Sequence, residues 1–139
     1  MSNEFKQISL KRGFMKHNGG LLFKTISESN YEFKATIKES HLNAAGITHG
    51  GFIATFIDAG AGTAAHRVAD QKPCVTISLE IKFISPVKLG QELIGKTKIQ
   101  KKTKSMVFLT CELITENKIV ATASGVWKIL KLTGAGPGG

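Results

Sequence analysis

The sequence is poor in the residues that build several common classes of protein. It contains only 2 cysteines, 1 tryptophan and 1 tyrosine among 139 residues. Cys74 and Cys111 are too few for a disulfide framework, and both lie in strand-like runs, where we expect them to pack as small apolar residues. The 4 histidines and 2 cysteines form no zinc-type spacing, so the sequence predicts no metal and no other cofactor.

Long apolar runs are also missing. No stretch of about 18 or more apolar residues occurs, so the sequence predicts neither a transmembrane helix nor a membrane partner. The first residues, MSNEFKQISLKRGF, lack the apolar centre of a secretory signal. They are mildly amphipathic and basic, which leaves a mitochondrial presequence as an alternative. We expect a reducing, intracellular setting, and the cytoplasm is the simplest one.

Acidic side chains are scarce relative to basic ones. There are 19 lysines and arginines against 10 aspartates and glutamates, and the formal net charge is +9. This balance favours an anionic partner such as a nucleic acid, a membrane surface or a phosphate-bearing small molecule, unless it serves solubility alone. A nucleic-acid partner is disfavoured because the few aromatic residues leave little for a stacking surface, and no RNA- or DNA-binding motif is present.

The length predicts one domain over residues 1–132, followed at 133–139 by a low-complexity tail, TGAGPGG, that we expect to be disordered or foreign to the fold. Apolar residues at helical spacing predict a long helix over 50–69. Its glycines, Gly60 and Gly62, are poor helix formers and indicate close packing. Other segments predict an amphipathic helix near 3–16 and strands at 31–38, 75–83, 91–100, 105–115 and 118–130.

This order of elements predicts an α+β fold in which one antiparallel sheet curls over one helix. Short connections between the last four strands favour antiparallel pairing of consecutive strands. Within 75–83 the residues alternate, so that Leu79 and Ile81 are expected on one face of the strand and Thr76 on the other.

The stretch HLNAAGITHGGFIATFID, from His41 to Asp58, carries the strongest functional signal. Polar groups and glycines are gathered in a short loop, and a long apolar segment follows. Asp58 is the only charged residue between Gly50 and Ala65. Because an unpaired buried carboxylate is costly, we expect Asp58 to have either a hydrogen-bonding partner or a chemical task.

Together with the order of elements, this motif resembles the hotdog-fold acyl-CoA thioesterases, and most closely their phenylacetate-degradation branch. A second similar element is ISPVKLGQEL at 84–93. The resemblance implies cofactor-free hydrolysis of acyl-CoA to a free acid and coenzyme A. It also implies homodimers that assemble into homotetramers, with Asn43 and Gly50 of one chain meeting Asp58 of its neighbour. The residues that carry the resemblance are Asn43, Gly46, His49, Gly50, Gly51, Thr55 and Asp58.

Thioester hydrolysis needs a nucleophile and a stabilised oxyanion, but no strong acid, because a thiol leaves with a pKa near 8.5. The Gly50 amide, at the start of the helix, suits the oxyanion. The resemblance implies that Asp58 is the general base or the nucleophile. Asn43 either orients water or substrate or simply forms a turn, and His49 either caps the helix or lies against the thioester. Thr76 either orients Asp58 or water or is an ordinary strand residue.

Coenzyme A would account for part of the positive charge through its phosphates. The acyl group stays open between aromatic, medium-chain and long-chain groups. A non-catalytic acyl-CoA-binding protein of the same fold is the alternative function, and dehydratase chemistry is disfavoured because the required Asp/His arrangement is not found. For each basic candidate, an ordinary solvated side chain is the competing interpretation. The predicted substrate-binding residues are Gly51, Arg67, Lys82, Lys88, Lys101, Lys102 and Lys104.

Overall fold

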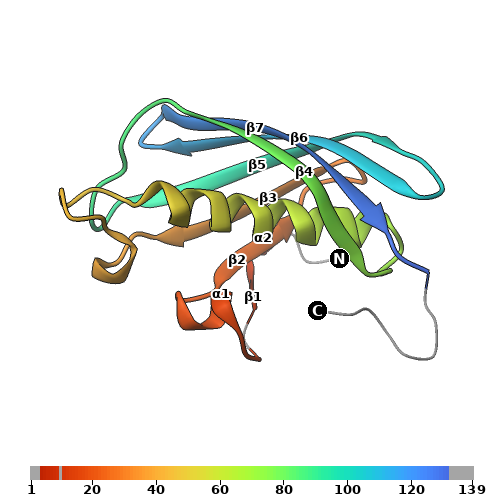
Figure 1. Cartoon of the computed structure of the whole chain (residues 1–139), viewed down its shortest axis with the longest axis horizontal. Helices are drawn as coiled ribbons and strands as arrows, with labels where there is room; N and C mark the ends of the chain where they lie inside the picture. The colour runs from red at the N-terminus through yellow and green to blue at the C-terminus, as the bar shows by residue number, and fades with distance from the viewer. Residues whose placement is uncertain (1–3, 10, 132–139) are drawn as a thin grey trace.

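The structure is a computed structural model that describes residues 4–9 and 11–131. It consists of a seven-stranded antiparallel sheet that curves over one long helix, α2 (Gly50–Val68), as Figure 1 shows. The α+β class, the antiparallel sheet and the central helix are therefore confirmed. The predicted tail at 133–139 lies outside the described residues. The strands are β1 (Lys6–Ile8), β2 (Leu21–Thr25), β3 (Asn30–Thr36), β4 (Cys74–Phe83), β5 (Glu92–Lys102), β6 (Met106–Thr115) and β7 (Lys118–Ile129).

The N-terminal region differs from the expected helix. Only Phe14–His17 are helical, as the single turn α1, and the residues before them form β1, which pairs antiparallel with β2. Gly13 has a φ of 99°, a left-handed conformation that a continuous helix over 3–16 would not allow. The prediction of an amphipathic helix here is wrong, and β2 was not predicted. Cross-strand hydrogen bonds to β2 outweigh a weak helical pattern in so short a segment.

The strand order corrects the expected pairing of consecutive strands. It runs β1-β2-β3-β5-β6-β7-β4, so β4 pairs with β7 and not with β5. The segment 84–91 carries the chain from the end of β4 to the start of β5, which lies between β3 and β6. As a result β4 is an edge strand, and both of its faces are largely exposed. The pairings β5–β6 and β6–β7 are consecutive, as expected.

A tight contact fixes how α2 lies against the sheet. A Cβ atom built on Gly60 of α2 or on Gly95 of β5 would lie 2.3 Å from the ring of Phe33 on β3. Only glycine leaves room for this fully buried ring, which also packs on Phe56 of α2 with ring centroids 4.8 Å apart. The prediction that Gly60 answers a packing demand is confirmed.

A bulge in β4 changes which side chains face α2. Thr76 is opposite Trp127 of β7, but Ser78 is opposite Val126, so the register shifts by one residue between them. A bulge of this kind moves the side chains before it to the other face. Thr76 therefore faces α2, as do Leu79 and Ile81, which pack against the core. The predicted alternation, with Thr76 on the opposite face from Leu79, is wrong for this reason.

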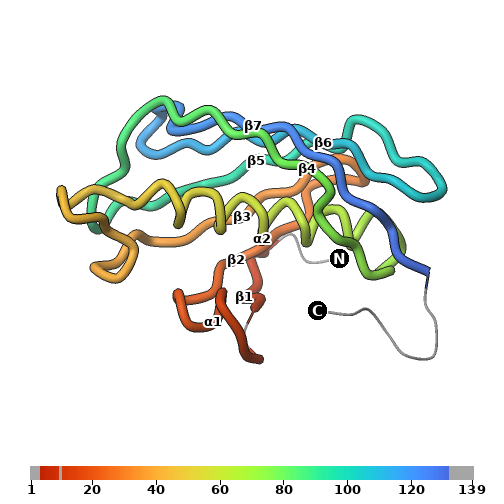
Figure 2. The backbone as a smooth tube through the Cα atoms, in the orientation of Figure 1, coloured from red at the N-terminus to blue at the C-terminus, as the bar shows by residue number. Residues whose placement is uncertain are grey.

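Figure 2 shows how the fold separates the two ends of α2. The loop that leads into α2 and the segment 84–91 lie at one end of the molecule, and they are joined by a bridge between Ile47 and Lys88. The start of β4 and the end of β7 lie at the other end, beside the last turns of α2. None of the helices described is both long enough and apolar enough to cross a membrane.

Candidate active site

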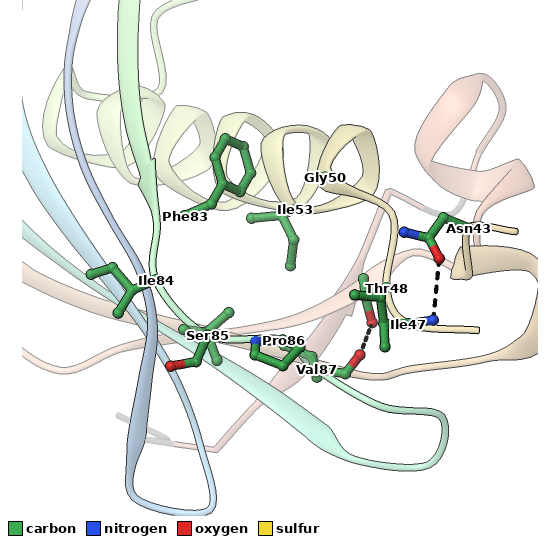
Figure 3. Close-up of a pocket in the computed structure, with 11 residues that line it drawn as sticks. Asn43, Ile47, Thr48, Gly50, Ile53, Phe83, Ile84, Ser85, Pro86 and Val87 are labelled. Carbon is green, nitrogen blue, oxygen red and sulfur yellow. Dashed lines mark hydrogen bonds between the residues drawn. The ribbon is translucent and has the colours of Figure 1, made fainter. Parts of the chain in front are cut away.

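The first group of site residues surrounds the start of α2. Asn43, Thr48, Gly50 and Ile53 line one side of a pocket of about 450 Å³, and residues 83–87, which begin with Phe83, line the other. Figure 3 shows these side chains around the first turn of the helix. A Cβ atom on Gly50 would lie 3.6 Å from the Phe83 ring, so the ring forms a wall close to the helix backbone. We call this cavity the Gly50 pocket.

The backbone amides at the start of α2 are divided between two tasks. His49 is the N-cap, and its Nδ1 accepts a hydrogen bond of 2.7 Å from the Gly51 N–H. The Gly50 N–H makes no hydrogen bond within the described part of the chain. Since the first amides of a helix also carry the positive end of its dipole, Gly50 presents a free donor to the pocket. The structure thus brings Gly50 into the site and uses the Gly51 amide for capping.

His49 and Gly51 line a different cavity, together with Phe14, His41 and Thr55. Of the two roles open to His49, the structure places it in the capping role. His41 is a packing residue: it is buried, and its ring stacks on Phe52 with centroids 3.8 Å apart. Gly51 was predicted to bind substrate. Its contacts do not support this prediction, because its amide is bonded to His49 and it lines the other cavity.

Asn43 takes the turn-forming role considered for it and leaves its amide donor open. Its Oδ1 accepts hydrogen bonds from the Ala45 N–H at 2.9 Å and the Ile47 N–H at 3.3 Å, which makes it a turn-forming residue. Its Nδ2 makes no hydrogen bond with any residue in the described ranges, and the side chain lines the Gly50 pocket (Figure 3). The loop contacts orient the amide, so a second donor is available beside the Gly50 N–H.

The second group of site residues surrounds Asp58, two turns further along α2. The Thr76 hydroxyl donates a hydrogen bond of 2.6 Å to Asp58 Oδ1. Asp58 and Thr76 line a pocket of about 510 Å³ with Gly62, His66 and Trp127, among other residues. We call this cavity the Asp58 pocket. Asp58 thus has the hydrogen-bonding partner that was one of the two expectations for it, but its side chain is exposed in the single chain, so it is not the buried carboxylate that the sequence suggested.

Most residues of the Asp58 pocket were not predicted as site residues, among them Trp127, His66 and Cys74. Trp127, the one tryptophan, is 2 % exposed, and its indole N–H makes no hydrogen bond with the described residues. The Nδ1–H of His66 donates to the Lys72 carbonyl at 2.8 Å. Burial raises the pKa of the Cys74 thiol, so this thiol stays protonated and is a poor nucleophile. The signal in the sequence for His66 is its position eight residues after Asp58, on the same face of the helix.

The two pockets share no residue, and the helix holds them apart. Gly50 and Asp58 are eight residues apart in α2, which is roughly 12 Å along the axis at 1.5 Å per residue. A general base and an oxyanion donor must both lie within about 3 Å of the reacting groups. A single chain therefore cannot apply Gly50 and Asp58 to one carbonyl group.

The predicted basic residues do not form one cluster in the single chain. Lys88 lies beside the loop of the Gly50 pocket, whereas Lys101 and Lys102 lie at the opposite end of β5. Lys82 is exposed on β4. The Arg67 guanidinium lies over the Phe23 ring, 5.0 Å from its centroid, where it is part of the packing beneath the sheet. Lys104 is the exception, because it lines a large cavity with three other lysines.

Comparison with known proteins shows the family to which the chain belongs. The sequence pattern of the thioesterase superfamily matches residues 45–122, from the loop before α2 into β7. The chain belongs to the thioesterase superfamily. It is 34% identical over 94 residues to a Pseudomonas aeruginosa protein whose name marks it as a candidate esterase, covering 67% of this chain and 70% of that protein. It is 25% identical over 118 residues to human acyl-coenzyme A thioesterase 13, covering 84% of each.

This thioesterase also shares its fold with the Escherichia coli PaaI protein from the phenylacetic acid degradation operon. The TM-score is 0.76 at 21% sequence identity, covering 86% of this chain and 85% of that one. The predicted hotdog fold is therefore confirmed, and its likeness extends to the branch that the motif resembles. As a member of this superfamily the protein is a thioester hydrolase.

Proposed function

We propose that the protein hydrolyses acyl-CoA thioesters to a free acid and coenzyme A. Asp58 of one chain activates water, and Gly50 of a second chain polarises the thioester carbonyl. The superfamily match and the likeness to human acyl-coenzyme A thioesterase 13 support this substrate class. The observation that carries the proposal is the carboxylate of Asp58, which Thr76 holds at 2.6 Å while the side chain remains open to a pocket.

The hydrogen bond from Thr76 divides the work between the two oxygens of Asp58. Oδ1 accepts from the hydroxyl, so Oδ2 is free to take a proton from water. The water oxygen bonds to the carbonyl carbon, the carbon–sulfur bond then breaks, and coenzyme A leaves as a thiolate. Since a thiolate is a good leaving group near neutral pH, no acid is needed to protonate the leaving sulfur. In the other course open to the same carboxylate, Oδ2 attacks the carbonyl carbon, the thiolate leaves, and water hydrolyses the resulting mixed anhydride.

The oxyanion that forms during attack needs donors that are already in place. The free Gly50 N–H and the Asn43 Nδ2 both face the Gly50 pocket, and the helix dipole adds positive potential there. Neither donor has to give up a contact within the chain before it binds substrate. Stabilisation of this kind commonly contributes a factor of about 10²–10³ to the rate constant.

A second copy of the chain would bring the two pockets together. Gly50 and Asp58 cannot meet in one chain, because roughly 12 Å of helix separates them. The edge strand β4 carries exposed apolar side chains, with Ile77 51% and Phe83 58% exposed, and such an edge favours pairing with another chain. Two-fold symmetry would then complete two identical sites. Assembly of such dimers into a tetramer follows from the family resemblance alone.

The direct test is the substitution Asp58→Asn, assayed with CoA esters of graded length and with aromatic esters. We expect kcat to fall by a factor on the order of 10²–10⁴, because the base is lost while shape is kept. Binding of the same esters, measured by calorimetry, should change little. Full turnover in this variant would overturn the mechanism. A protein that binds CoA esters tightly without any turnover that depends on Asp58 would instead be the non-catalytic binder of the alternative interpretation.

A further inference from the structure

A large cavity at the far end of the molecule has no role in the site described so far. It measures about 840 Å³ and lies where β7 ends and β4 begins. Ser105, Ile129 and Leu130 contribute to its lining, and the other described residues that line it are all lysines. None of these lysines forms an ion pair with a residue in the described part of the chain. We call this cavity the lysine cavity, and its lysines are Lys72, Lys104, Lys128 and Lys131.

Four ammonium groups around one cavity repel one another unless an anion lies between them. The cavity floor is partly apolar, since Ile129 is buried and Leu130 half-buried. This combination suits a ligand that carries several negative charges together with a flat or apolar group. The chemistry matches the diphosphate, 3′-phosphate and adenosine of coenzyme A, the substrate handle in the function proposed above, on which this inference rests.

The lysine cavity and the Asp58 pocket share no residue, but sequence neighbours line the two. Pro73 and Trp127 line the Asp58 pocket, and the next residues in the chain, Lys72 and Lys128, line the lysine cavity. Lys72 precedes Thr76 by four residues, which in extended backbone is roughly 13 Å at 3.3 Å per residue. The pantetheine arm of coenzyme A separates the thioester sulfur from the diphosphate by a chain that reaches this far.

A second, independent observation lies between the two cavities. Trp127 is 2 % exposed, yet its indole N–H has no hydrogen-bond partner among the described residues, and it lines the Asp58 pocket. A Cβ atom on Gly62 would lie 3.3 Å from Trp127 Nε1, so the glycine keeps the space beside this donor open. The indole nitrogen itself reaches the pocket, since the Thr97 hydroxyl is the one fully buried side-chain polar atom without a partner among the described residues, so a ligand or water in the pocket can accept this N–H.

We infer that coenzyme A runs from Asp58 along the last turns of α2 to the lysine cavity. Its phosphates bind Lys72, Lys104, Lys128 and Lys131, and an amide carbonyl of the pantetheine arm accepts the Trp127 N–H. Gly62 is four residues, or roughly 6 Å, beyond Asp58 along the helix, which places the donor where the first amide of the arm would pass. The lysine pair Lys101 and Lys102 and the more distant Arg67, Lys82 and Lys88 take no part in this path.

The test is binding of coenzyme A without turnover, measured by titration calorimetry. The double variant Lys72→Gln/Lys128→Gln removes two charges from the cavity. The matched control Lys96→Gln/Lys98→Gln removes two exposed lysines from β5, outside the cavity. We expect the cavity variant to bind coenzyme A at least about tenfold more weakly, with a smaller dependence on salt, and the control to change it by less than about twofold.

Shorter ligands separate the two parts of the path. Pantetheine, which lacks the phosphates, should bind the wild type and the lysine cavity variant equally. Trp127→Phe keeps an aromatic side chain of smaller size and removes the N–H, and it should weaken pantetheine and coenzyme A by a similar factor of about three to ten. Thermal melts check that the protein with the buried substitution Trp127→Phe remains folded. The substitutions of Lys72 and Lys128 lie on the surface and do not depend on that check.

Several outcomes would overturn the inference. Equal losses in the cavity variant and the control would mean that net charge alone attracts coenzyme A. Unchanged binding in the cavity variant would place the phosphates elsewhere. No binding to the wild type would rule out this path for coenzyme A. Because no turnover is involved, failure of the Asp58→Asn test would leave a tenfold loss of binding in the cavity variant intact, so the two proposals fail separately.

Discussion

The polar groups at Gly50 and at Asp58, the two ends of one stretch of α2, are left free in opposite ways. Around Gly50 the side-chain acceptors are already used inside the chain, since His49 Nδ1 binds the Gly51 N–H and Asn43 Oδ1 binds two loop amides. What remains free are hydrogen-bond donors. Around Asp58 the donor Thr76 is used, and what remains free is a carboxylate oxygen. One end can stabilise negative charge, and the other can accept a proton.

This difference shows why neither end is a complete site. A hydrolase needs an acceptor for the proton of water and donors for the oxyanion within a few ångströms of one carbon atom. The helix places these groups roughly 12 Å apart, so one chain alone cannot bring both of them to one carbon atom of a substrate.

The largest effect expected at the Gly50 end comes from removing its amide hydrogen. Gly50 is the first residue of α2, a position that accepts proline, and His49 before it has φ −63° and ψ 134°, as a residue before proline requires. Gly50→Pro should therefore fold normally and lower kcat by a factor of about 10²–10³. Gly50→Ala keeps the N–H and adds a methyl group at ordinary contact distance from Phe83, and it serves as the control. Equal activity in the two variants would remove the Gly50 amide from the mechanism.

Mixing two inactive variants tests whether the ends act across chains. Asp58→Asn and Gly50→Pro chains refolded together should form dimers in which one of the two sites has both groups intact. With random pairing, roughly a quarter of wild-type activity should return. Each variant refolded alone provides the baseline. Activity in the mixture no higher than that of the separate variants would show that the two groups do not serve one site.

A smaller effect is expected from the hydroxyl that holds Asp58. Thr76→Val keeps the shape and suits a strand, but it removes the hydrogen bond to Oδ1. We expect kcat to fall by about tenfold with little change in KM, because the carboxylate is no longer oriented. Thr76→Ser restores the hydroxyl and should recover most of the rate. A rate that does not distinguish valine from serine would make Thr76 an ordinary strand residue.

The smallest effect on the rate is expected at His49. Because His49 caps the Gly51 amide rather than lining the Gly50 pocket, His49→Ala should cost about 1 kcal/mol of stability while kcat changes by less than about threefold. His49→Asn offers another capping group and should restore the melting temperature. Thermal melts and steady-state assays measure the two quantities. A large loss of kcat in a variant with normal stability would return His49 to the reaction.

The helix was predictable because its signal is local. Apolar residues at helical spacing, a run of small residues and the glycines at 50 and 51 mark α2 without reference to the rest of the chain. The N-terminal segment failed for the opposite reason: β1 has only three residues and exists through its hydrogen bonds to β2. The edge position of β4 likewise depends on β5 and β7, which come later in the sequence.

The site residues also divide into those that the sequence alone indicates and those that depend on contacts between distant segments. Asp58, Asn43 and Gly50 stand out in the sequence because their residue types are unusual for their surroundings. The contact between Thr76 and Asp58 depends on a bulge in β4, and no local sequence pattern predicts this bulge. Trp127 reaches the Asp58 pocket only because β7 pairs with β4, although they lie far apart in the chain. The lysines of the lysine cavity come from three separate turns or strand ends.

The sequence by itself determined the family, the central helix and the chemical identity of the groups that we propose to react, because these depend on residue types and short spacings. Only the tertiary structure decided which of their atoms are free. It used the Gly51 amide and Asn43 Oδ1 inside the loop, left the Gly50 N–H and one oxygen of Asp58 open, and held those two roughly 12 Å apart. Hydrogen bonds between distant segments and the rigid rise of a helix set these distances, and neither can be read from neighbouring residues.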